Sequence, residues 1–214
     1  MRVTAIERPP RKRRYNVRID GARVIPLSRE VLAAANLRVG QEVDDSRVAE
    51  LEAAEARHTA MASALRLLSY RQRSEREMRD ALRSKGIPEA IAGETLDRLR
   101  ELRLLDDQAF AEAWTESRQR HRPRGRRMLL AELAQKGVER ELAQASVAEI
   151  DEEADALRAG RKRSQTLRGR EFREFRRRLG DFLARRGFGY DVCEATIKQL
   201  WAEVATPTAN SGTL

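Results

Sequence analysis

The sequence has few of the residues that form disulfides, metal clusters or catalytic sites. Its 214 residues include one cysteine and two histidines, and 5% of them are aromatic. A single cysteine excludes an internal disulfide and any multi-cysteine metal site. Because no carboxylates converge in the sequence either, nothing obvious could activate water, which argues against a nuclease or other enzyme. We therefore expect no catalytic residue, no metal and no cofactor, and we expect Cys193 to be a small buried residue rather than a reactive thiol.

Long apolar stretches are also absent. No run is long enough to cross a bilayer, and the N-terminal residues lack the apolar segment of a secretory signal. We expect a cytoplasmic protein, monomeric and without membrane contact. Charged residues, in contrast, make up 36% of the chain, with only six prolines, which is typical of long solvated helices. The net charge of +9 predicts attraction to polyanions or to an acidic protein surface.

A repeated helix ending organises the chain. It is spelled LRSKGI at Leu82–Ile87, LAQKGV at Leu133–Val138 and LARRGF at Leu183–Phe188. If each glycine is the left-handed residue of a Schellman cap, the leucine and the apolar residue after the glycine are the pair that touch in that motif. The glycines are about 51 and about 50 positions apart, a period found in helical repeat arrays.

Apolar residues recur at the same period. Met78 corresponds to Leu129 and Leu179, Ile91 to Leu142 and Val192, Leu96 to Val147 and Ile197, and Leu99 to Ile150 and Leu200. Their separations suit one face of a helix, so each unit is predicted to be a helix, the capped turn and a second helix, with a further helix in front. We expect a mainly α fold of stacked units, because one unit buries too little alone. The predicted boundaries are 46–104 for the first repeat, 105–151 for the second, 152–205 for the third and 206–214 for a disordered polar tail.

Residues 1–45 differ from the repeats. Residues 1–14 are rich in arginine and predict a mobile basic arm. The alternation in Tyr15–Ile19, followed by a turn at Asp20 and Gly21, predicts a hairpin whose second strand is Arg23–Leu27. A short helix is expected at Arg29–Ala35. No role follows from these residues.

Two helix starts are signalled by their capping residues. Ser74 and Glu77 have the spacing of a capping box. Asp106 is the predicted N-cap of the next helix, with Leu105 and Phe110 as the two ends of a hydrophobic staple. A divalent metal on Asp106 and its neighbour Asp107 is the disfavoured alternative. Phe110 and Trp114 are one turn apart, so we expect them in the core rather than in a base-stacking platform.

Two basic runs stand at the joint between the first and second helices of the second and third units. One holds six arginines between Arg118 and Arg127 with no acid, and the other holds nine basic residues between Arg161 and Arg178 against two acids. The alternative for any such run is a solvated face. Two runs at corresponding joints favour a contact stripe, which we predict to consist of Arg118, Arg120, Arg124, Arg126, Arg127, Arg161, Lys162, Arg163, Arg168 and Arg170.

The segments SEREMRDALRSKGI, LLDDQAFAEAW, RRMLLAELAQKGV and FRRRLGDFLARRGF, at these distances, resemble the RecX family of regulatory proteins over about residues 60 to 203. The resemblance implies an elongated, slightly curved array of three-helix units. It also implies binding in the groove of the RecA recombinase filament on single-stranded DNA, with double-stranded DNA as a further candidate partner. There the protein would block filament growth and dampen ATP hydrolysis, strand exchange and co-protease activity, and so act in DNA repair, recombination and the SOS response.

A second hypothesis needs no recombinase. The same positive charge would give a stand-alone nucleic-acid-binding protein on a helical-repeat scaffold, with salt-sensitive affinity for DNA. The residues alone leave both hypotheses open.

Overall fold

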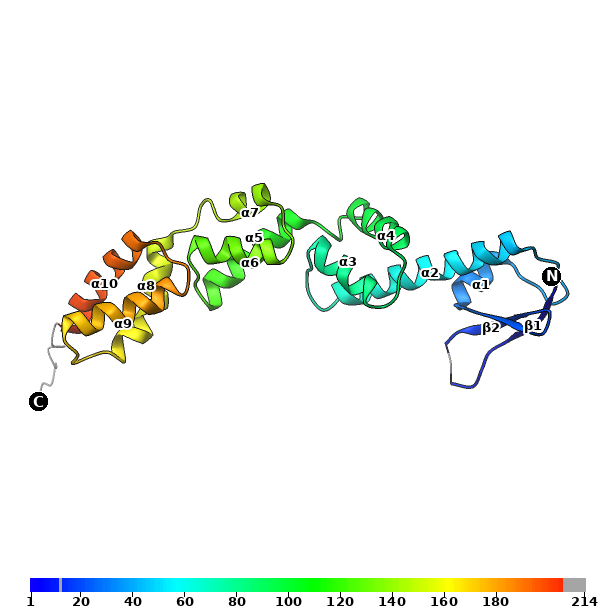
Figure 1. Ribbon diagram of the computed structural model, residues 1–214, viewed down its shortest axis with the longest axis horizontal. Helices are drawn as coiled ribbons and strands as arrows, with labels where there is room; N and C mark the ends of the chain where they lie inside the picture. Colours follow the sequence, from blue (N-terminus) through cyan, green and yellow to red (C-terminus); the bar gives the residue numbers. More distant parts are fainter. Residues whose placement is uncertain (12, 206–214) are drawn as a thin grey trace, which may run out of the picture. The chain divides into compact units, whose positions relative to one another are not determined.

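The computed structural model describes residues 1–11 and 13–205, which form three strands and ten helices (Figure 1). The predicted tail, 206–214, lies outside the described residues. The chain divides into two compact units. The first contains Met1–Arg73 and Glu77–Leu105, and the second contains Ser74–Arg76 and the residues from Asp106 onward.

The N-terminal module is a three-stranded antiparallel sheet packed against a short helix and the start of a long one. Strand β2 (Tyr15–Ile19) pairs with β3 (Arg23–Leu27) as the predicted hairpin, and helix α1 (Arg29–Ala35) follows. Strand β1 (Val3–Glu7) pairs with β2 and makes the sheet order β1-β2-β3. The predicted hairpin and short helix are therefore confirmed, whereas the segment predicted as a mobile basic arm contains a third strand, β1.

The physical reason for the extra strand is a short apolar alternation inside the basic segment. Val3 is 1% exposed and lies opposite Ile19, and it joins a core with Val17, Ile25 and Leu27. The dense charge that follows this strand concealed it in the sequence, because only one position of the strand is fully buried.

The first repeat consists of α2 (Asp45–Leu68), α3 (Glu75–Arg83) and α4 (Glu89–Glu101). Helix α2 is shared between two cores. Val48 and Leu51 near its start pack with the sheet, whereas Ala60 and Ala64 near its end pack against α3 and α4. The N-terminal module is thus attached to the first repeat by one continuous helix.

The second repeat consists of α5 (Asp107–His121), α6 (Arg126–Gln135) and α7 (Arg140–Ser146). The third consists of α8 (Glu152–Gln165), α9 (Phe172–Ala184) and α10 (Tyr190–Ala205). Each repeat has its own apolar core. The aligned residues Met78, Leu129 and Leu179 are all completely buried. The predicted mainly α fold of three tandem three-helix units is confirmed.

The repeated turn has the predicted Schellman geometry in all three copies. Gly86, Gly137 and Gly187 have φ values of 75°, 81° and 88°. In the first copy the amide of Ile87 donates to the carbonyl of Leu82 at 3.3 Å, and the other copies make the equivalent bonds at 3.1 and 3.4 Å. The three leucines of the motif are completely buried. The turn therefore closes each repeat over its own core.

The predicted N-cap of α5 is confirmed, whereas the predicted hydrophobic staple is not. Asp106 is the N-cap of α5 and accepts from the amides of Gln108 and Ala109 at 2.9 and 3.0 Å. The proposed staple fails, because Leu105 packs in the core of the first repeat and Phe110 in the core of the second. Phe110 instead stacks on Trp114 with 5.9 Å between ring centroids, as expected of core residues.

Candidate binding surface of the second and third repeats

The second and third repeats stack through the joint between α5 and α6. The amide of Gly125 in this joint donates to the carbonyl of Arg186 in the capped turn of the third repeat at 2.9 Å. A Cβ atom on Gly125 would overlap the backbone of Gly187, so the close approach requires glycine. One residue further on, the amide of Arg126 donates to Oε1 of Glu152 at 2.8 Å.

Similar contacts join the second repeat to residues 74 and 75, at the start of α3. Ser74 Oγ donates to the carbonyl of Lys136 at 2.5 Å, and the amide of Glu75 donates to Oδ1 of Asp107 at 2.8 Å. Burial raises the pKa of Asp107 despite this hydrogen bond. Asp107 and Glu152 are each the first residue of a repeat's leading helix, and each carboxylate satisfies the first amide of a preceding middle helix.

Sequence reasoning missed this role of the two acids. Asp107 was considered only as a metal ligand, yet the described residues contain no group of three side chains that could hold a metal ion. The sequence does contain a signal for it, because the same pattern recurs in two repeats. Asp107 follows the N-cap Asp106, and Glu152 follows the N-cap Asp151.

Two of the predicted contact residues are held inside the second repeat. Arg118 Nε donates to Oε2 of Glu132 at 2.7 Å, and its guanidinium lies 4.4 Å from the centre of the Trp114 ring. Trp114 Nε1 donates to the same carboxylate oxygen at 2.9 Å, and Arg124 Nε lies 3.7 Å from Oε1 of Glu132. Glu132 therefore neutralises much of the charge that Arg118 and Arg124 would present to a partner.

The other three predicted residues of this run lie differently. Arg120 is exposed and pairs with Glu116 on the preceding turn. Arg126 is half-buried at the start of α6. Arg127 is exposed, and its Nη2 donates to the carbonyl of Ala184 at the end of α9 at 3.3 Å. Arg127 thus brings positive charge from the second repeat onto the surface of the third.

The predicted residues of the third repeat lie at the end of α8 and in the joint leading into α9. Arg161 is 3.8 Å from Glu203, and Arg170 is 3.7 Å from Glu174. Lys162 and Arg168 are exposed, and Arg163 is half-buried with Nη1 3.5 Å from Oγ1 of Thr166. This group lies where α9 begins, whereas Arg127 contacts the residue where α9 ends. A helix of that length is about 18 Å long, so the ten predicted residues form two groups rather than one cluster.

A groove on α9 and α10 occupies the surface between these groups. It has a volume of about 800 Å³ and an apolar floor that includes Phe188, Cys193 and Ile197. The exposed ring of Tyr190 lines it, together with four arginines and four acids, which are Arg127, Arg173, Arg176, Arg177, Glu171, Glu174, Asp181 and Glu194. Sequence reasoning counted Arg173 and Arg177 in the basic run but left them out of the contact stripe. The signal that would include them is their place on α9 between the two groups.

Charge is also concentrated where the second repeat meets the third. Arg186 Nη1 donates to the carbonyl of Pro123 at 3.5 Å, and its guanidinium lies 4.4 Å from the centre of the Phe182 ring. Burial lowers the pKa of Arg186, and repulsion from Arg124 and Arg122 adds to this effect. This part of the surface therefore holds several cations near one another, which an anionic partner would stabilise.

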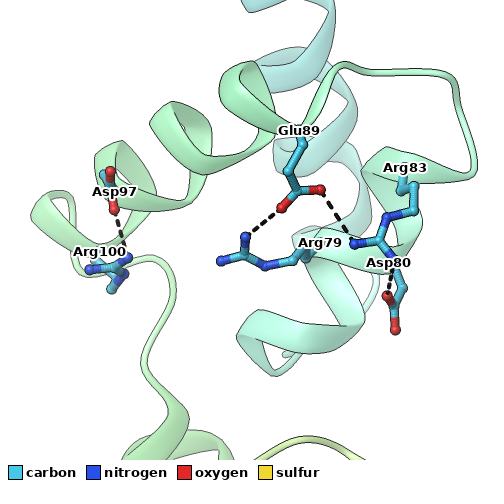
Figure 2. A network of polar contacts seen from close by, with 6 residues as sticks. All are labelled: Arg79, Asp80, Arg83, Glu89, Asp97 and Arg100. Atoms are coloured by element: carbon cyan, nitrogen blue, oxygen red, sulfur yellow. Dashed lines mark hydrogen bonds and ion pairs between the residues drawn. The ribbon is translucent and has the colours of Figure 1, made fainter.

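Arginines of the first repeat are also paired with acids. Figure 2 shows Glu89, at the start of α4, between Arg79 and Arg83 of α3, with bonds of 2.6 and 3.4 Å. The hydrogen bond from Arg79, with a second one from Arg83, lowers the pKa of Glu89. Arg100 pairs with Asp97 at 2.6 Å further along α4. The pairs of Glu89 with Arg79 and Arg83 connect α3 to α4 across the capped turn.

The observations define a class of protein: tandem three-helix repeats that each carry the same capped turn over an apolar core, with an arginine-rich run in each of the last two. No helix in the described part of the chain is both long and apolar enough to span a membrane. Residues 60–99, 106–147 and 151–197 match the family models for the first, second and third three-helix domains of RecX. The chain belongs to the RecX family.

Several known proteins are similar over most of the chain. "Regulatory protein RecX" of Streptomyces lividans is 38% identical over 156 residues, which cover 72% of this chain and 83% of that protein. The protein of the same name from Bacillus velezensis is 30% identical over 189 residues, covering 87% of this chain and 72% of its own length.

Solved structures agree with the fold. A crystal structure of regulatory protein RecX is 28% identical, with a TM-score of 0.65 over 92% of this chain and 98% of its own. The crystal structure of RecX from Lactobacillus salivarius is 24% identical, with a TM-score of 0.62 over 69% of this chain and 97% of its own.

Proposed function

We propose that this protein regulates the RecA recombinase by binding its filament on single-stranded DNA and inhibiting filament growth. The observation that carries the proposal is the match of all three repeats to the three RecX domains, in order and at consecutive positions. The relatives are named regulatory proteins. Inhibition of ATP hydrolysis, strand exchange and co-protease activity would follow from reduced filament formation.

The proposed contact surface comprises the two arginine groups and the groove between them. The acid-to-amide contact and the Gly125 approach fix the second repeat against the third, so their basic groups keep a constant spacing. Basic groups at a constant spacing suit a filament, because its repeating subunits and the DNA that it carries present acidic side chains or phosphates at regular intervals. Of the ten predicted residues, the exposed ones, such as Arg127, Arg161 and Lys162, are proposed to contribute most.

The proposed mechanism requires binding alone. A protein that occupies a filament surface prevents the addition of further subunits without breaking a covalent bond, and the ATPase rate then falls with the length of the filament. Regulation without catalysis by this chain is therefore part of the proposal.

The test is the single-stranded-DNA-dependent ATPase of RecA, titrated with this protein. The proposal predicts a decrease in the rate at protein amounts well below one per recombinase subunit, because a blocked end affects a whole filament. An unchanged rate up to one protein per subunit, with filaments of normal length in electron micrographs, would refute it.

Stand-alone nucleic-acid binding is the second candidate, and the excess of arginine on the third repeat favours it. Binding to bare single- and double-stranded DNA should be compared with binding to filaments at about 0.15 M salt, where exposed charges are screened beyond about 8 Å. Equal or tighter binding to bare DNA would favour this candidate over the recombinase.

A further inference from the structure

The N-terminal module and α2 line a hollow, and five of its lining residues are arginines. It has a volume of about 690 Å³ and lies within the first compact unit. Three separate segments supply its arginines, which are Arg8, Arg13 and Arg14 before β2, Arg29 on α1, and Arg66 on α2. We call it the N-terminal arginine cleft. Most of it precedes residue 60, where the match to the RecX domains begins.

The cleft has an ordered polar wall. Glu55 is 8% exposed, and its Oε2 accepts from the amide of Ser28 at 2.6 Å. Arg14 Nε lies 3.2 Å from Oε1 of the same carboxylate, and Arg14 Nη2 donates to Oγ1 of Thr59 at 2.8 Å. These contacts tie the segment before β2 to α2. Because Glu55 is already bound to Arg14 and to the amide of Ser28, its negative charge is not available to balance the other arginines.

Three of the arginines have no such compensation. Arg13, Arg29 and Arg66 are exposed, and within the described residues their side chains make no hydrogen bond or ion pair. The second acid of the lining, Glu30, lies 3.8 Å from Nε2 of His58. Five arginines thus surround one hollow that has two carboxylates, and one of those carboxylates is buried against Arg14 and Ser28. Like charges gathered around a hollow repel one another until an anion enters.

We propose that the N-terminal arginine cleft binds the phosphate backbone of nucleic acid. A single carboxylate of a protein partner has two oxygens and is satisfied by one guanidinium. Arginines that approach from three directions suit a chain of phosphates, each of which offers oxygens on several sides. The half-buried ring of Tyr15 in the lining offers a flat surface beside that path. This site is separate from the surface on the second and third repeats and does not depend on a recombinase.

The test uses the full chain and no recombinase. Arg13→Gln, Arg29→Gln and Arg66→Gln are combined, and binding to a fluorescent single-stranded oligonucleotide and to its duplex is measured at several salt concentrations. The matched control combines Arg38→Gln, Lys85→Gln and Arg103→Gln, which are exposed, lie in the same unit outside the cleft, and make no side-chain bond in the described part of the chain. Both variants lose three positive charges, so a difference between their DNA affinities shows that the location of the charges in the cleft matters.

The expected result is a loss of about tenfold in affinity for the cleft variant, with a smaller loss for the control. The plot of log affinity against log salt concentration should become less steep, its slope decreasing in magnitude by about two to three. Each lost phosphate contact reduces that magnitude by about 0.7 to 0.9. Thermal melting should be the same for both variants. Affinity and slope equal to those of the control would overturn the proposal.

A third outcome would also overturn it. If DNA affinity is unchanged and binding to recombinase filaments is lost, the cleft takes an acidic protein surface instead. Failure of the RecA ATPase titration, in contrast, would leave the cleft result intact, since the oligonucleotide measurement contains no recombinase.

Discussion

The backbone amide of Arg126, the first residue of α6, donates to the side chain of Glu152, the first residue of α8, at 2.8 Å. Asp107 and Glu75 have the same relationship. The acid therefore serves two purposes, because it favours the start of its own helix and satisfies an amide of another. At Glu152 the second and third repeats are therefore joined by a hydrogen bond.

The first prediction concerns this cap. Glu152→Ala should lower the free energy of unfolding by about 1 kcal/mol, the usual cost of losing a helix cap. Urea unfolding followed by circular dichroism measures it. The neighbouring Glu153→Ala is the control, because Glu153 is exposed and makes no side-chain bond in the described part of the chain. Equal stability of the two variants would show that the contact contributes nothing.

The repeat architecture could be predicted from the sequence, because the Schellman turn needs both a glycine and a buried leucine at fixed spacing. The recurring acid after each aspartate N-cap is visible in the sequence, but the amide that Asp107 binds is not, since it is a backbone group 32 residues away. Strand β1 was missed because a single buried valine stands beside a dense run of arginines. Arg118 was assigned to the contact surface because its partner Glu132 lies on another helix.

The second prediction separates strain from overlap at the repeated turn. Gly86 and Gly137 have similar φ values, but a Cβ on Gly86 would meet nothing within 4 Å, whereas one on Gly137 would overlap the side chain of Arg76. Gly86→Val should cost about 1 kcal/mol or more from the left-handed backbone. Gly137→Val should cost about 1 kcal/mol beyond that. Urea midpoints that fall equally in both would show that Arg76 moves aside freely.

The third prediction concerns the proposed RecA surface. Arg127→Glu, Arg161→Glu and Lys162→Glu together should weaken inhibition of the RecA ATPase by about tenfold, because three exposed cations become anions. The melting temperature should stay nearly unchanged, since these side chains make few internal contacts. Unimpaired inhibition would remove these residues from the proposed surface.

Arg118→Ala is the contrasting variant for that experiment. Arg118 is bonded to Glu132 and stacked on Trp114, so its loss should reduce stability by about 1 kcal/mol. Inhibition should persist at temperatures where the variant remains folded. A stable Arg118→Ala variant that fails to inhibit would instead make Arg118 a contact residue.

The fourth prediction concerns acid. The pKa of Glu89 is lowered in the folded protein, chiefly by the hydrogen bond from Arg79. A lowered carboxyl pKa contributes stability that is present above the unfolded value, about 4.3, and is lost as the pH falls through the folded value. Glu89→Gln should therefore lose less stability than the parent between about pH 6 and pH 3 in urea titrations. The effect is small because the carboxylate is exposed.

A control for the acid experiment is Glu149→Gln. Glu149 is exposed and has no ion pair in the described part of the chain. Comparison of the two variants separates the loss of one surface carboxylate from the loss of the ion pairs with Arg79 and Arg83. If Glu149→Gln and Glu89→Gln flatten the pH dependence equally, the pairing of Glu89 with Arg79 and Arg83 does not persist in solution.

The last prediction uses Cys193 as a reporter of the third repeat. The residue is 6% exposed, and burial raises the pKa of its thiol, so little reactive thiolate exists in the folded protein near neutral pH. Reaction with Ellman's reagent should be slow in buffer and complete quickly in urea, and the release of thionitrobenzoate follows it directly because the chain has one cysteine. Leu179→Ala, which opens a cavity in the same core, should accelerate the native reaction by destabilising that repeat by about 2 to 5 kcal/mol. If the parent instead reacts in buffer as fast as it does in urea, the α9–α10 groove admits the reagent directly, because no unfolding of the core is then needed to expose the sulfur.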